Sequence, residues 1–158
     1  MLQPTIKADH FSADIQAFIR LLHEHGVQYV IAGGEAVIYH GHPRLTGDAV
    51  KLYGALSAFW DGDIPGVLDP VELIQPGLIL QFGRPPNRID LLNQIDGVSF
   101  EEAWSTRTEV ALVSEEGSFP VYYLGLAKLI ENKRAASRPK DLQDIEYLGS
   151  ASENSDPD

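Results

Sequence analysis

The first apolar residues of the chain recur at the spacing of a helix. They fall at Phe11, Ile15, Phe18, Ile19 and Leu22, which places them on one face of an α-helix. Ser12 precedes this face as a suitable N-cap, and Gly26 stands where a helix-terminating glycine belongs. The pattern therefore predicts an amphipathic helix that begins after Ser12 and ends at Gly26.

The next segments predict a strand and two further helices. A β-rich apolar run, residues 27–32, predicts a buried strand that ends at Gly33-Gly34. Residues 35–39 are expected to form the first turns of a second helix, and a polar loop follows them. From Ala49 the apolar residues return at helical offsets as far as Trp60. This spacing predicts a helix over residues 49–60.

The second half of the chain alternates short strands with helices. Glycine and proline residues between 61 and 76 predict a loop. The expected strands are 78–82 and 88–92, paired as a hairpin, then 110–113 and 121–123. The expected helices are 100–104, capped by Ser99, then 124–136 and a last one running from near Pro139 to about 148. We expect one α+β (α/β) domain over residues 1–148 and a disordered acidic tail over 149–158.

Composition narrows the chemistry that this domain can perform. The 158 residues include no cysteine, which excludes a thiolate nucleophile, a thiolate metal site and a disulfide framework. The net charge of -11 argues against tight binding to bulk nucleic acid. Five of the twelve basic residues nevertheless cluster at Lys128, Lys133, Arg134, Arg138 and Lys140. This cluster is either a local phosphate site or a solvated helix face.

No segment has the length or hydropathy of a targeting or membrane-spanning element. The first ten residues contain no apolar run of signal-peptide length. No stretch approaches the roughly 18 apolar residues of a spanning helix. We therefore expect a cytoplasmic protein without a membrane partner.

Three features are candidates for chemistry. Gly33-Gly34 between a strand and a helix would let a phosphate approach the backbone amides, although such a pair can also be a tight turn. Arg44, Thr46 and Asp48 follow in a polar loop. Asp90 lies between two apolar residues of a strand, where a buried carboxylate requires a partner or a metal ion. Alternation along the strand also allows Asp90 to face solvent.

These features together resemble a known family. Residues 33–48 read GGEAVIYHGHPRLTGD, and further similar stretches lie at 83–92, 97–103 and 129–144. Over roughly residues 9–148 the chain resembles the AbiEii/MenT-like nucleotidyltransferases of the polymerase-β-like superfamily. The resemblance implies a mixed sheet flanked by helices. It also implies transfer of a nucleoside monophosphate from an NTP to a hydroxyl of RNA or protein.

The resemblance also implies roles for individual residues. Asp48 and Asp90 match catalytic carboxylates that bind Mg²⁺. The residues that match nucleotide-binding positions are Gly33, Gly34, Arg44, Thr46, Lys133, Arg138, Lys140 and Asp141. The partners implied are an NTP, a tRNA or protein acceptor, and an antitoxin protein.

The chain departs from this family directly after Asp48. The family continues with an apolar residue, a second Asp and the rest of a strand, whereas this chain continues with Ala49 and Val50. Either the strand has been deleted, or the printed sequence omits a segment. With the strand, the expected function is Mg²⁺-dependent transfer. Without it, we expect a catalytically degenerate module that binds a nucleotide or a protein.

Loss of the strand has further consequences. It would expose a sheet edge and favour a homodimer. Asp61 and Asp63 could replace the missing carboxylate, but a helix cap or a solvated turn is the simpler interpretation. His40 and His42 could bind a metal ion, but we expect them to be surface residues of a loop near the cleft.

Overall fold

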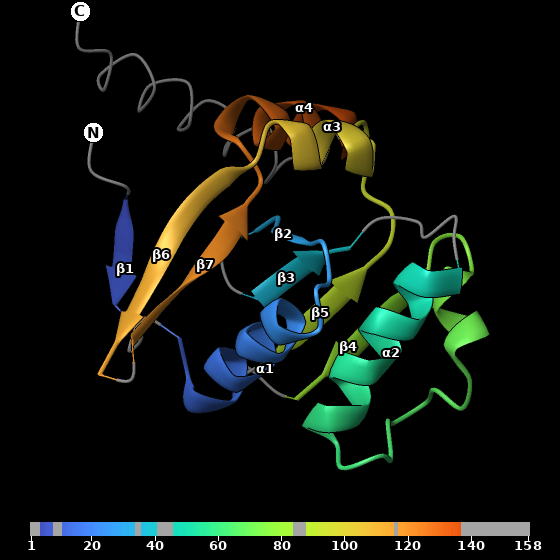
Figure 1. The fold of residues 1–158 in the computed structure, drawn as a ribbon. Helices are drawn as coiled ribbons and strands as arrows, with labels where there is room; N and C mark the ends of the chain where they lie inside the picture. The colour runs from blue at the N-terminus through green and yellow to red at the C-terminus, as the bar shows by residue number, and fades with distance from the viewer. Residues whose placement is uncertain are drawn as a thin grey trace, which may run out of the picture.

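A seven-stranded mixed sheet organises the chain (Figure 1). The structure, a computed structural model, describes residues 4–7, 11–33, 36–40, 46–83, 88–115 and 117–136. The strands are β1 (Thr5–Lys7), β2 (Val30–Ile31), β3 (Ala36–Tyr39), β4 (Ile79–Phe82), β5 (Ile89–Leu92), β6 (Thr108–Ser114) and β7 (Gly117–Tyr123). The helices are α1 (Ala13–Glu24), α2 (Thr46–Phe59), α3 (Phe100–Ser105), α4 (Leu126–Ala136) and the 3₁₀ helix η2 (Pro70–Ile74). The fold is α+β, as the sequence predicts.

Parallel and antiparallel pairs alternate across the sheet. The strand order is β1-β6-β7-β2-β3-β5-β4. β1 runs parallel to β6, β2 to β7, and β3 to β5, whereas the hairpins β6–β7, β2–β3 and β4–β5 are antiparallel. β3 lies between β2 and β5, so it joins the two halves of the sheet.

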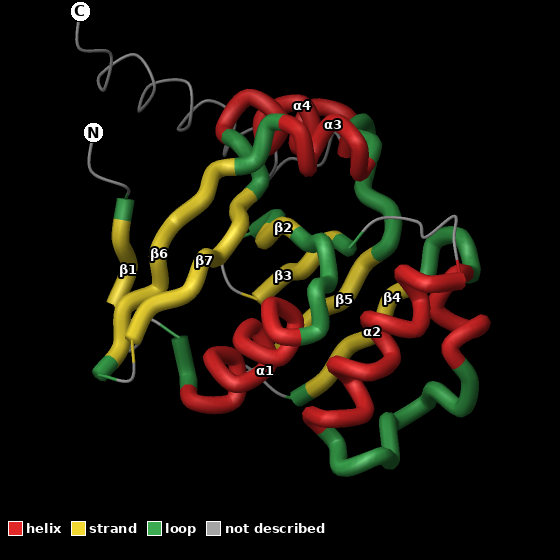
Figure 2. The backbone as a smooth tube through the Cα atoms, in the orientation of Figure 1, coloured by secondary structure: helices red, strands yellow, loops and turns green. Residues whose placement is uncertain are grey.

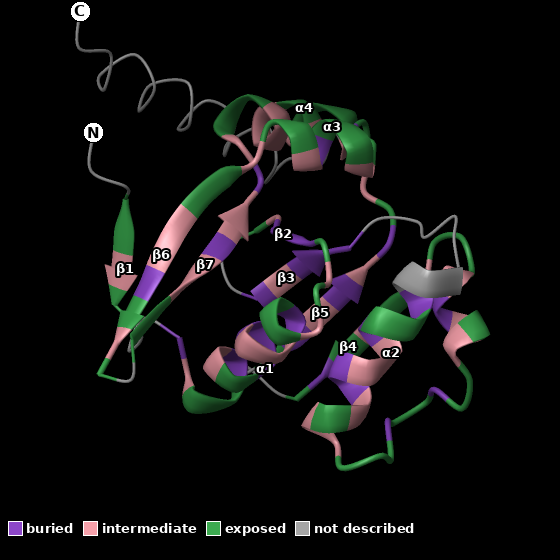
Figure 3. Cartoon of the chain, viewed as in Figure 1, coloured by how far each residue is buried: buried purple, intermediate pink, exposed green. Residues whose placement is uncertain are grey.

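Helices α1 and α2 cover one face of the sheet (Figure 2). The apolar stripe of α1 is buried as predicted, and the Ser12 side chain caps the helix by accepting a hydrogen bond from the Ile15 amide at 3.3 Å. From the sheet, Ile38, Ile89 and Leu91 enter the same core cluster as Leu52 of α2. The colouring by burial in Figure 3 follows this division, with purple segments where the strands lie under the helices.

Helices α3 and α4 pack on a second cluster. Its buried members are Val30, Tyr39, Val98, Ala103 and Leu124. The Ser99 side chain caps α3 as predicted, by accepting a hydrogen bond from the Glu102 amide. The Asn132 side chain donates to the Asp96 carbonyl at 2.9 Å, which ties α4 to the turn that follows β5.

Residues 36–39 form a strand, not the predicted helix. β3 pairs with β2 on one side and with β5 on the other. Its sequence, Ala-Val-Ile-Tyr, contains good strand formers, and three of its four residues are buried. A short apolar run without alternation fits a buried strand as well as a buried helix turn. Residues 36–39 form a strand because they pair with both β2 and β5 in the sheet.

The other helices and strands lie closer to the residue ranges that the sequence predicts. The helix expected from Ala49 begins at Thr46, and the strand expected over 27–32 has only Val30 and Ile31 paired. The sequence did not predict β1 or η2. The helix expected over 139–148 and the tail 149–158 lie outside the described residues. None of the helices in the described part of the chain is long and apolar enough to cross a membrane.

Replacement of Gly97 by alanine should destabilise the protein by about 3 kcal/mol, because two costs add. Gly97 has φ +76°, and a Cβ there would lie 2.6 Å from the Ala135 Cβ of α4. Urea unfolding would measure the loss. Gly62→Ala is the matched control, because Gly62 has φ +90° but no atom within 4 Å of the added Cβ. Equal losses in the two variants would contradict the close packing of Gly97 on α4.

Candidate functional site

The next described element after Gly33 is a strand, β3, and not a helix. Gly33 follows β2, and the Ala32 amide donates to the Val37 carbonyl at 2.7 Å across the antiparallel β2–β3 pair. Gly34 lies outside the described residues. Because this element is a strand, the described residues place no helix N-terminus after Gly33 to favour a phosphate. This corrects the expected strand–glycine–helix arrangement.

The Asp90 carboxylate forms an ion pair with Arg88, the residue directly before β5. Arg88 Nε donates to Asp90 Oδ1 at 2.9 Å, and Arg88 Nη2 donates to Oδ2 at 3.0 Å. The two residues lie two positions apart, so their side chains project from the same face of the sheet. This contact raises the pKa of the Arg88 guanidinium above its usual value. The sequence suggested Asp90 as a candidate but did not identify Arg88, for which the i, i+2 spacing was the available signal.

The strands beside Asp90 supply no second carboxylate. In the register of the sheet, Asp90 stands next to Val37 of β3 and next to Gln81 of β4. The Asp90 side chain is 17% exposed, whereas its neighbours Ile89 and Leu91 are buried in the core on the other face. Asp90 therefore projects away from α1 and α2. Within the described ranges, no three His, Asp or Glu side chains are grouped so that they could hold a metal ion.

The two predicted metal ligands belong to different elements, Asp48 to α2 and Asp90 to β5. Asp48 lies in the first turn of α2, and Leu52 and Leu56 of this helix pack against the face that Ile89 and Leu91 form. Asp90 projects from the opposite face. The side chains of Thr46 and Asp48 lie outside the described part of the structure, as does the whole of Arg44.

Asp61 and Asp63 form part of a solvated turn, as the simpler interpretation predicted. The turn follows α2: the Gly62 amide donates to the Ser57 carbonyl, and the Asp63 amide donates to the Trp60 carbonyl. Asp61 and Asp63 are both exposed. Helix α2 has 14 residues and is therefore about 20 Å long. This length separates Asp61 from Asp48, so the two cannot share an ion.

One predicted phosphate-binding residue lies in a described helix. Lys133 is in the last turn of α4, one residue after Asn132, which binds the turn that follows β5. The closing residues Arg138, Lys140 and Asp141 lie outside the described part of the chain. Lys128, by contrast, is held at 3.1 Å by Glu102 of α3 and at 3.1 Å by Glu131 of α4. The basic cluster is thus partly structural.

His40 is buried, not exposed in a loop as the sequence suggested. It follows β3, and its amide donates to the Leu92 carbonyl at 2.9 Å. Its side chain is 7% exposed, and neither ring nitrogen finds a hydrogen-bond partner among the described residues. Burial lowers the pKa of His40 from 6.5 to about 4. His42 lies outside the described residues.

Comparison with known proteins leaves the family as an expectation. No family model, no curated protein and no solved structure matches this chain. The relation to nucleotidyltransferases therefore still depends on the motifs of the sequence alone.

His40 should make the protein less stable as the pH falls. Its folded-state pKa of about 4 lies below the unfolded value of 6.5, so the unfolded chain takes up a proton first. Stability is full above pH 6.5 and is lost progressively towards pH 4, by about 3 kcal/mol for this residue. Urea unfolding of the protein and of His40→Leu at several pH values would measure the effect. The stability of His40→Leu relative to the unaltered protein should rise as the pH falls from 7 to 4, and a constant difference would contradict the prediction.

Proposed function

We propose that this protein is a catalytically degenerate relative of the nucleotidyltransferases that binds a nucleotide without transferring it. The observation that supports this most directly is the position of Val37 beside Asp90 in the sheet. An enzyme of this type needs a second carboxylate close to the first, because paired carboxylates share the two Mg²⁺ ions that activate the attacking hydroxyl and hold the phosphates. Here the neighbouring positions carry valine and glutamine.

The described residues do not fit a Mg²⁺ pair. Mg²⁺ requires near-ideal octahedral coordination by oxygen ligands. Asp90 offers one carboxylate, and its two oxygens already accept the hydrogen bonds of Arg88. We therefore assign no catalytic step to a metal ion.

Nucleotide binding is supported by the cationic end of α4. Lys133 and Arg134 lie in its last turn, where their positive charges interact favourably with the helix dipole. Asn132 and Gly97 hold this end of the helix against the turn after β5, on the side of the sheet where α3 and α4 pack. A lysine ammonium binds a phosphate group as a point charge. A small local site suits a nucleotide better than extended RNA, because the chain as a whole is strongly acidic.

The protein should bind ATP or another NTP weakly and should bind it equally well with Mg²⁺ or with a chelator. Calorimetric titration with each of the four NTPs would measure the affinity. Lys133→Gln should weaken binding by about tenfold, because it removes a charged hydrogen bond to phosphate. Lys51→Gln, an exposed lysine on α2, is the matched control and should leave the affinity unchanged.

A transfer assay distinguishes this function from catalysis. With an α-labelled NTP and either tRNA or the protein itself as acceptor, no label should be transferred. Transfer that disappears in Asp90→Asn would show an active enzyme and would overturn the proposal. Failure of every NTP to bind would also overturn it and would leave a protein-interaction role.

A homodimer through β4 is a second candidate role. β4 is one of the two edge strands of the sheet, it contains no charged residue, and Ile79 is 60% exposed. Such an edge can pair with its own copy across a twofold axis. We expect a concentration-dependent dimer in light scattering coupled to gel filtration. Salt should strengthen it by screening the charge of -11 on each chain, and Ile79→Lys should give a monomer at all concentrations.

A further inference from the structure

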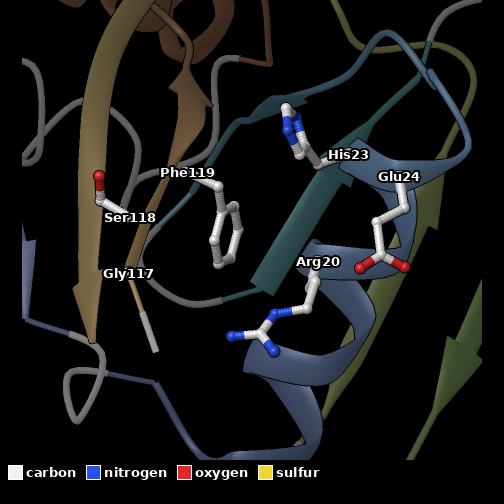
Figure 4. A pocket seen from close by; sticks show the side chains of 6 residues that line it. All are labelled: Arg20, His23, Glu24, Gly117, Ser118 and Phe119. Atoms are coloured by element: carbon white, nitrogen blue, oxygen red, sulfur yellow. The ribbon is translucent and has the colours of Figure 1, made fainter. Parts of the chain in front are cut away.

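A pocket away from the end of α4 is lined by charged, polar and aromatic side chains. It lies between α1 and the start of β7, and its volume is about 240 Å³ (Figure 4). The residues that line it are Arg20, His23, Glu24, Gly117, Ser118 and Phe119. The first three are spaced i, i+3 and i+4 on α1, so they lie on one face of the helix. None of these residues belongs to the site described above.

Phe119 provides the apolar surface of this pocket. The Arg20 guanidinium carbon lies 5.5 Å from the centre of the Phe119 ring. The His23 ring lies 5.8 Å from the same centre and is inclined by 27° to it. In Figure 4 the Phe119 ring faces the α1 side chains, whereas the Ser118 side chain points away from them. The pocket thus combines an aromatic surface with nitrogen donors on one side.

Charge and size limit the ligand. Arg20 is permanently cationic, and its guanidinium has five N–H groups, so it can bind a carboxylate through two of them. Glu24 also lines the pocket, and its negative charge offsets that of Arg20, which favours a singly charged anion over a phosphate or a triphosphate. A volume of about 240 Å³ is below the roughly 300–1,000 Å³ of pockets for drug-sized ligands. It suits a molecule with a single ring.

We propose that the α1–β7 pocket binds a small aromatic monocarboxylate. The carboxylate lies against Arg20 and His23, and the ring packs on Phe119. This site is independent of the nucleotide binding proposed above, because it uses none of the same residues.

Amide chemical shifts during a titration with benzoate test this site. Saturable shifts should be concentrated at Gly117, Ser118, Phe119 and His23. Benzamide keeps the ring but has no charge, and acetate keeps the charge but has no ring. Both should bind at least about tenfold more weakly than benzoate.

Two variants assign the contacts. Arg20→Gln should weaken benzoate binding by about tenfold or more, and Phe119→Leu should reduce the preference for benzoate over acetate. Lys51→Gln, which removes one positive charge from α2, should bind benzoate as the unaltered protein does. Unchanged amide shifts outside the pocket would show that each variant is folded. Shifts at other residues, equal binding of benzamide, or full binding by folded Arg20→Gln would overturn the proposal.

Discussion

The pairing of β3 with both of its neighbours is the constraint on which the rest of the structure depends. β3 is the element that joins the strands β1, β6, β7 and β2 to the strands β5 and β4. Its four residues pair with all four residues of β5, and Ile38 is completely buried between the sheet and the helices. If residues 36–39 were helical, β2 and β5 would be left with unpaired backbone groups in the middle of the core, which is costly. The sheet therefore requires a strand at this place.

The same pairing determines the chemistry beside Asp90. β3 places Val37 beside Asp90, and the other residues of β3 are also apolar or aromatic, without a carboxylate. Asp90 then has no second carboxylate at its side, and it forms a bidentate ion pair with Arg88. That pair satisfies the half-buried charge without a metal ion. The surroundings of Asp90 thus depend on which segment occupies the centre of the sheet.

Ligand sites are proposed at two separate places in the fold. At one, the last turn of α4 brings lysine and arginine to the turn after β5. At the other, α1 and β7 enclose a pocket with charged and aromatic side chains. The nucleotidyltransferase motifs of the sequence give no indication of this pocket. Each proposed site contains a basic side chain on a strongly acidic chain, so binding there would depend on close contacts and not on the overall charge.

The sequence by itself determined the elements whose signals are local. The caps Ser12 and Ser99, the helical spacing within α1 and α2, and the β4–β5 hairpin were all predictable, because each depends on residues close together in the chain. The fold class followed from their alternation, and Asp90 was a candidate because of its apolar neighbours. Only the tertiary structure decided that residues 36–39 are a strand, that His40 is buried and that Arg20 faces Phe119. These outcomes depend on partners distant in sequence, and hydrophobic periodicity carries no information about which segment fills a given place in a sheet.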